Sequence, residues 1–157
     1  MQQNGRWRPW GFSLAELVVV MAIILIILAV AVPYMQSAHQ NAIEVVVIRE
    51  VQTIHQAQIQ YMSQFGNYAA TLAELGPPSS GATPGPHAAS LIPRSLASGE
   101  KDGYLFSMMR VPAGYTVNAN PKVFGSNGRR TFYLDQDGIV HQNWGQEPST
   151  VNSPEIK

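Results

Sequence analysis

The most constraining feature of the sequence is an apolar run at residues 17–32, which holds sixteen residues without one charge. A helix that is apolar on every side has to lie in lipid or inside a bundle of helices. Counted from Phe12, the run covers 21 residues, which is long enough to cross a membrane. Arg6 and Arg8 precede it and no acidic residue lies before Glu16, so the positive-inside rule directs the rest of the chain outward.

One carboxylate, Glu16, stands at the start of this run. An acidic side chain inside a bilayer costs about 2.5–3.5 kcal/mol on insertion scales, and a single-pass anchor has no evident use for it. A cut between Gly11 and Phe12 would expose a new α-amino group with an ordinary pKa of about 7.7–8.0. This amine would meet Glu16 of its own chain at an i, i+4 spacing, or Glu16 of a neighbouring chain. The second pairing would favour assembly, because a paired charge in apolar surroundings is much less disfavoured than an unpaired one.

Residues 11–17, Gly-Phe-Ser-Leu-Ala-Glu-Leu, together with a short basic leader and a long apolar helix, resemble the class III signal of type IV prepilins and type II secretion pseudopilins. The resemblance implies cleavage after Gly11 by a prepilin peptidase that also N-methylates Phe12. It further implies polymerisation into a helical filament, with Phe12 and Glu16 as the assembly residues. Many pilins of this family carry a C-terminal disulfide loop, whereas this sequence has no cysteine.

An ordinary secretory signal is the alternative for the same segment. Arg6 and Arg8 would form its basic region, and Ala29 and Ala31 would form a small-x-small cleavage site. That alternative leaves Glu16 unexplained. The intact mass of the mature protein separates the two, because one predicts loss of residues 1–11 and the other loss of residues 1–31.

Beyond the apolar run, Pro33 removes one backbone donor and predicts a kink, either a plain membrane-exit kink or, by the resemblance, a place where the helix loosens in the filament. The pattern then becomes amphipathic and predicts a single helix over residues 12–65, with its membrane-spanning part at about 12–32. The face expected to carry the head comprises Ile43, Val47, Val51, Ile54, Ala57, Tyr61 and Phe65. The residues expected to lie off that face are Gln36, Gln40, Glu44, Val45, Ile48, Gln52 and Gln56.

Residues 66–157 are expected to form a globular head. Within residues 66–102, Thr71 and Glu74 have the spacing of a capping box and predict a short helix, a second short helix is expected at 90–97, and 76–86 is a Pro- and Gly-rich loop. Apolar residues then alternate with period two over residues 103–142, which predicts a four-stranded antiparallel sheet with a hairpin at Asp137-Gly138. The expected core residues are Tyr104, Phe106, Phe132 and Leu134. The tail, residues 143–157, is rich in Pro, Ser and Asn and is expected to be loose. The predicted fold class is therefore α+β and pilin-like, with a long N-terminal helix on a small antiparallel sheet.

Composition excludes several kinds of site. Ten basic residues balance ten acidic ones, and without cysteine neither a disulfide nor a thiolate metal site can form. His39 and His55 lie too far apart in sequence to indicate a metal site, and Asp135 with Asp137 favours a turn over calcium, which prefers six to eight oxygen ligands. Arg129 and Arg130 are adjacent basic residues with three possible roles. They are expected to lie in a solvated loop, and the alternatives are contact with a neighbouring subunit or with DNA phosphates. The sequence shows no nucleophile–base set and no phosphate-binding loop, so we expect that the protein is not an enzyme and binds neither a cofactor nor a metal.

The expected function is that of a structural subunit which polymerises through its N-terminal helix into a type IV pilus or pilus-like filament. A major-type pseudopilin of a type II secretion system is the alternative, and a secreted or anchored binding module that does not polymerise is a further one. The resemblance implies as partners other copies of the chain, other pilin-like subunits, the prepilin peptidase, an inner-membrane assembly platform, and lipid before assembly. It implies an inner-membrane location with the head outward, followed by a periplasmic or extracellular filament.

Overall fold

The computed structural model describes residues 11–79 and 81–156. The predicted leader, apart from Gly11, lies outside the described residues, and so does Ser80. The chain divides into two compact units with the boundary between Ala38 and His39. A single helix, α1 (Leu14–Phe65), supplies the described helical residues of the first unit and the first part of the second.

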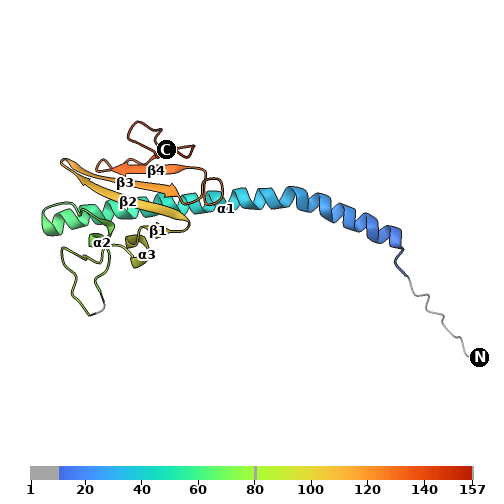
Figure 1. The fold of residues 1–157 in the computed structure, drawn as a ribbon, viewed down its shortest axis with the longest axis horizontal. Helices are drawn as coiled ribbons and strands as arrows, with labels where there is room; N and C mark the ends of the chain where they lie inside the picture. Colours follow the sequence, from blue (N-terminus) through green and yellow to red (C-terminus); the bar gives the residue numbers. More distant parts are fainter. Residues whose placement is uncertain (1–10, 80, 157) are drawn as a thin grey trace, which may run out of the picture. The chain divides into compact units, whose positions relative to one another are not determined.

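The second unit consists of the C-terminal part of α1, two short helices and a sheet (Figure 1). The short helices are α2 (Leu72–Leu75) and α3 (Arg94–Ala97). The strands are β1 (Glu100–Lys101), β2 (Tyr104–Val111), β3 (Gly114–Pro121), β4 (Thr131–Asp135) and β5 (His141–Asn143). All neighbouring strands are antiparallel and follow chain order, so the sheet is a meander.

The α+β fold with a long apolar N-terminal helix packed on an antiparallel sheet is confirmed, but the predicted strand count is wrong. The sheet has five strands among the described residues, because the two-residue β1 pairs with the start of β2. A two-residue strand shows no period-two alternation, so no pattern in the sequence marks it. The last strand was expected over residues 139–142 but begins at His141, where pairing with β4 starts, and the carbonyl of Val140 instead accepts from Ile156 N.

The core lies between α1 and the sheet. The four core residues named from the sequence are buried, and so are the central positions of the helix face, with Ile43 and Phe65 partly buried at its ends. Further core side chains come from β3 and Val140 and from the segment between α1 and β1. They are Tyr115, Val117, Ala119, Val140, Ala69, Leu72, Leu75, Ala89, Ile92 and Leu96. Gln58 joins this segment to the helix, because its amide accepts from Ala69 N at 2.9 Å and donates to Ala69 O at 3.0 Å.

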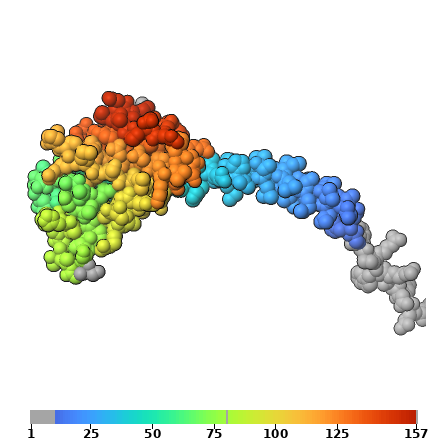
Figure 2. Space-filling view, in the orientation of Figure 1, coloured from blue at the N-terminus to red at the C-terminus, as the bar shows by residue number. Residues whose placement is uncertain are grey.

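The tail is not loose as predicted. Gln142 N donates to Pro154 O at 2.9 Å and Ile156 N donates to Val140 O at 2.8 Å, so the tail returns to the sheet after a turn. Figure 2 shows the tail, in red, against the strands in orange. A Pro- and Ser-rich composition predicts irregular backbone, which this segment has, but irregular backbone can still be held by hydrogen bonds.

Candidate functional site

The start of α1 carries the residues expected to act in assembly. Phe12 and Ser13 precede the helix, and Phe12 is 82% exposed. Ser13 O accepts the first helical hydrogen bond from Leu17 N, which makes Ser13 the N-cap. Cleavage after Gly11 and methylation of Phe12 stay predictions.

Glu16 has a local partner that was not expected from the sequence. Its Oε2 accepts from Ser13 N at 2.8 Å, and Ser13 Oγ accepts from Ala15 N at 3.3 Å. Together these bonds form a capping box, and the carboxylate also lies at the positive end of the helix dipole. The expectation that an anchor has no use for Glu16 is therefore wrong. A capping role and an assembly role are compatible, since the side chain is exposed.

The apolar run that follows has no partner within the described residues. An 18-residue window of α1 is apolar enough to span a membrane, and none of it is buried. The large side chains exposed over this run are Leu17, Val18, Val19, Val20, Met21, Ile23, Ile24, Leu25, Ile26, Ile27, Leu28, Val30 and Val32. A continuous apolar surface of this kind requires lipid or other protein chains around it. α1 therefore contains one segment that could cross a membrane, and it continues through Pro33 without interruption, so the kink stays a prediction.

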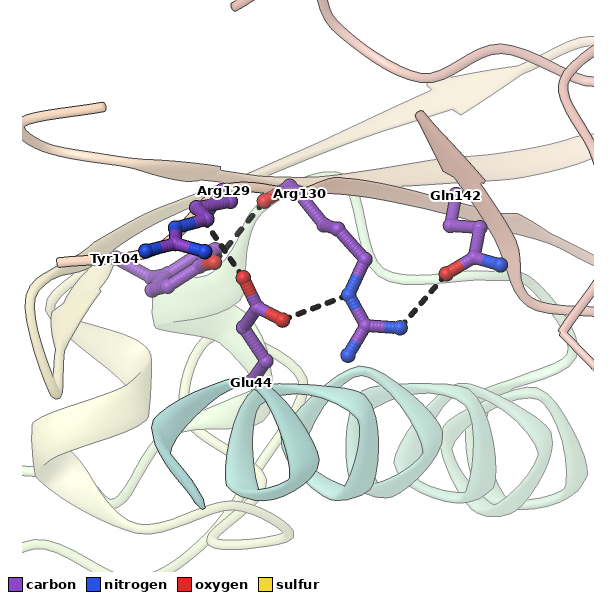
Figure 3. Close-up of polar contacts among 5 residues, drawn as sticks. All are labelled: Glu44, Tyr104, Arg129, Arg130 and Gln142. Atoms are coloured by element: carbon purple, nitrogen blue, oxygen red, sulfur yellow. Dashed lines mark hydrogen bonds and ion pairs between the residues drawn. The ribbon is translucent and has the colours of Figure 1, made fainter. Parts of the chain in front are cut away.

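A second group of polar side chains joins the second unit's part of α1 to the loop between β3 and β4. We call this group the polar clamp: Gln40, Glu44, Arg129, Arg130 and Gln142. Figure 3 shows the clamp without Gln40, together with Tyr104. Glu44 is 1% exposed, and its two carboxylate oxygens accept from Arg129 N and from Arg130 Nε, each at 2.7 Å. Arg130 also donates to Gln142 Oε1 at 2.8 Å, which extends the clamp to β5.

One turn earlier on α1, Gln40 completes the clamp. Its Nε2 donates to Gly125 O at 2.6 Å and to Ser126 O at 3.2 Å. In Figure 2 the residues near 125–130, in orange, lie against the cyan part of α1. Both Gln40 and Glu44 had been expected off the buried face, and both are buried. The prediction for these two residues used hydrophobicity alone. Their burial is favourable because they bond to groups about 85 residues further along the chain.

The guanidinium of Arg130 lies close to two aromatic rings. Its guanidinium carbon lies 5.4 Å from the ring centroid of Phe132 and 4.9 Å from that of Trp144. Arg130 is therefore not a solvated loop residue as favoured from the sequence. Arg129, in contrast, is exposed, and its guanidinium has no hydrogen bond or ion pair to any described residue.

Tyr104 lies beneath the same loop. Its hydroxyl donates to Arg130 O at 3.0 Å, and a Cβ on Gly128 would come within 1.9 Å of that hydroxyl oxygen. Burial, with a smaller contribution from the nearby Glu44 carboxylate, raises the pKa of Tyr104 well above its ordinary value. The loop between β3 and β4 thus packs closely on the hydroxyl of a tyrosine that stays protonated at neutral pH.

A different pattern in the sequence would have pointed to the clamp. Alternating steps of four and three residues along α1 connect Gln40, Glu44, Val47, Val51, Ile54, Gln58 and Tyr61, all of which are buried. Polar residues at three positions of such a stripe indicate side chains with specific partners, because an unpaired buried polar group is costly. The partners themselves are distant in sequence and no local pattern identifies them.

The other candidate residues have structural surroundings. Asp135 Oδ1 accepts from Asp137 N at 3.0 Å within the turn between β4 and β5, and Oδ2 accepts from Tyr133 at 3.2 Å. His55 Nδ1 is hydrogen-bonded to the hydroxyl of Tyr115. Over residues 11–79 and 81–156, no group of three or more His, Cys, Asp or Glu side chains is arranged to hold a metal ion.

Comparison of the chain with known proteins finds no matching family model, no matching curated protein and no matching solved structure.

Proposed function

We propose that the chain is a structural subunit that is stored in a membrane and polymerises through its N-terminal helix into a type IV pilus or a pilus-like filament. The observation that carries this proposal is the contrast along α1. Residues 17–32 expose every large apolar side chain, whereas the buried positions from Gln40 to Tyr61 are held in a folded head. A segment of the first kind suits two successive environments, first lipid and then the packed helices of a polymer.

The signal-like sequence at residues 11–17 supports the same proposal, because its resemblance to the prepilin signal concerns the very residues that precede the exposed run. The Phe12 amine that cleavage frees on one chain would neutralise Glu16 of the neighbouring chain. Moving the helix from lipid into a filament gains little hydrophobic free energy, since lipid tails are already apolar. The charge pair and close packing would therefore select the register. The proposal covers a surface pilus and a periplasmic pseudopilus alike.

The decisive variants are Glu16→Gln and Glu16→Ala, produced together with the assembly machinery. Gln at the third position of a capping box still accepts from the Ser13 amide but carries no charge. We expect both variants to insert and to be cleaved after Gly11, and we expect filament yield, measured by shearing and electron microscopy, to fall severely in both.

Ser13→Ala is the matched control, because it removes the N-cap hydroxyl and keeps the carboxylate. It should assemble nearly as the unchanged protein does. Normal filaments from Glu16→Gln together with defective filaments from Ser13→Ala would assign Glu16 to capping alone and defeat the charge-pairing proposal.

A further inference from the structure

A hydrogen-bonded loop at residues 123–129 presents apolar side chains outward. Val123 is 56% exposed and Phe124 is 36% exposed. The loop is closed by its own hydrogen bonds, since Asn127 N donates to Val123 O at 3.0 Å and Val123 N donates to Asn127 Oδ1 at 3.1 Å. These bonds fix the backbone conformation in which both apolar side chains are exposed.

The clamp ties this loop to a defined point of α1. Gln40 donates to the carbonyl oxygens of Gly125 and Ser126, and it follows Val32, the last residue of the apolar run, by only eight residues. Eight helical residues rise about 12 Å, and even a fully extended chain of that length reaches at most about 29 Å. The polar headgroup layer of a bilayer adds about 5–8 Å on each side of its hydrocarbon core. A loop fixed at Gln40 is therefore within reach of the headgroups whenever residues 17–32 span a membrane.

The chemistry of the neighbouring residues suits such a surface. The guanidinium of Arg129 is free of hydrogen bonds and ion pairs to the described residues, while the carboxylate beside it, Glu44, is already occupied by Arg129 N and Arg130. Trp144, stacked on Arg130, is 66% exposed. Arg129 is the chain neighbour of Arg130, so the loop brings a basic side chain next to the residue on which Trp144 stacks. Exposed aromatic, aliphatic and basic side chains are typical of protein segments that lie in the interface of a membrane with anionic lipids.

From this arrangement we infer that the head carries a lipid-contact surface, formed by Val123, Phe124, Arg129 and Trp144, which binds the headgroup region of the membrane before assembly. The inference rests on the membrane-anchored state of the proposed function, but not on polymerisation. Val123 and Phe124 would enter the interface, and Arg129 would bind lipid phosphate. Contact with lipid would hold the unassembled head in one orientation on the membrane surface.

The test uses the full chain, which has no cysteine and therefore accepts a single thiol label. Ser126→Cys places a fluorophore on the loop, and Ser79→Cys places one on an exposed loop elsewhere on the head. Each protein is inserted at one chain per nanodisc, into phosphatidylcholine with or without phosphatidylglycerol, with a nitroxide quencher on the lipid headgroup. We expect strong quenching at residue 126, stronger still with phosphatidylglycerol, and little quenching at residue 79.

Variants separate the apolar and the charged parts of the contact. Val123→Ser with Phe124→Ser should reduce quenching in both lipid mixtures. Arg129→Gln should remove only the increase caused by phosphatidylglycerol, with about a fivefold loss of the contacting population for one basic residue near an anionic surface. Arg49→Gln, the same change at an exposed position of α1, should leave quenching unchanged.

Equal quenching at residues 126 and 79 would overturn the inference. Protection of residue 126 that appears only with two chains per disc would assign the surface to a second copy and would also overturn it. Failure of the chain to insert would remove both this inference and membrane anchoring. Absence of filaments from the unchanged chain produced with the assembly machinery, combined with quenching at residue 126, would remove the assembly proposal alone.

Discussion

Glu44 and Arg130 show what a buried ion pair does in a small head. The Glu44 side chain is almost completely removed from water, the Arg130 side chain is 16% exposed, and both carboxylate oxygens accept from a donor. Desolvation of two charges offsets much of their attraction, so the pair adds little net stability compared with an apolar pair of similar volume. It adds specificity, because only one placement of the β3–β4 loop on α1 satisfies both oxygens.

Removing one partner of this pair should therefore be costly. Glu44→Ala leaves the largely buried Arg130 without a carboxylate and Arg129 N without its acceptor, and we expect a loss of about 3–5 kcal/mol in the free energy of unfolding. Urea unfolding followed by circular dichroism measures it. Glu100→Gln, which breaks the half-exposed pair with Lys122, should cost about 0–1 kcal/mol. The double change Glu44→Met with Arg130→Met should recover most of the loss, and similar costs for the two single variants would contradict this expectation.

Tyr104 predicts how the head responds to alkaline pH. Its pKa is raised above the ordinary value of 10.0, chiefly by burial, and the same direction holds for Tyr61, Tyr115 and Tyr133. A group with a raised folded-state pKa contributes stability that is fully present below its unfolded pKa and is lost as pH rises beyond it. The head should therefore lose stability progressively above pH 10. Urea midpoints from pH 8 to 12 should fall less steeply for Tyr104→Phe, while an unchanged slope would show that Tyr104 ionisation plays no part.

At the scale of elements, the turn between β4 and β5 is set by a glycine in a crowded place. Gly138 has φ +76°, and a Cβ there would lie 2.8 Å from Nε2 of His55 on α1. His55 is not free to move without cost, because its other ring nitrogen is bonded to Tyr115. The turn thus joins the hairpin to the helix as well as reversing the chain.

Gly66 offers a matched comparison for Gly138, with φ +75° and no atom within 4 Å of the position that a Cβ would take. Gly66→Ala should cost about 1–2 kcal/mol for the left-handed backbone alone. Gly138→Ala should cost that amount and about 0.5–1.5 kcal/mol more, because His55 has to leave Tyr115. Thermal unfolding measures both. The difference should vanish in a His55→Ala background, and a difference that persists there would locate the strain elsewhere.

At the scale of the whole molecule, the chain consists of two units with opposite relations to water. The core of the second unit draws on residues from Val47 to Val140, and its clamp begins at Gln40, so none of these contacts involves a residue before His39. The first unit has apolar surface without a partner among the described residues. The contacts that stabilise the head and the continuous apolar surface of α1 therefore lie in different parts of one chain.

Residues 39–157 produced alone should accordingly fold. We expect a cooperative thermal transition, a monomer by light scattering, and a protected tyrosine and tryptophan environment by near-ultraviolet circular dichroism. The full chain should instead require detergent or lipid. An unfolded or aggregated 39–157 fragment would show that the helical segment before Ala38 supports the head, against the division of the chain into two units.

Much of the architecture could be read from periodicity. The change from a 3.6-residue to a two-residue period at residue 103 predicted a helix followed by a sheet. Thr71 caps α2 as expected, and Gly138 lies in the predicted turn before β5. Local signals of this kind act over a few residues, so they survive in any context that buries the apolar face. The two-residue β1 and the docked tail carry no such signal, and they exist because backbone groups distant in sequence meet there.

The apolar run at residues 17–32 and the carboxylate before it could be identified from the sequence alone, because hydropathy and the position of one charged residue are local properties. Glu44 is the opposite case. Its burial became favourable only when residues 125–130 folded back to supply donors, and long-range pairing of that sort has no trace in nearby residues. The sequence thus specified which segment has an apolar surface that needs a partner. Which polar side chains connect the sheet and its loops to α1 depended on tertiary packing alone.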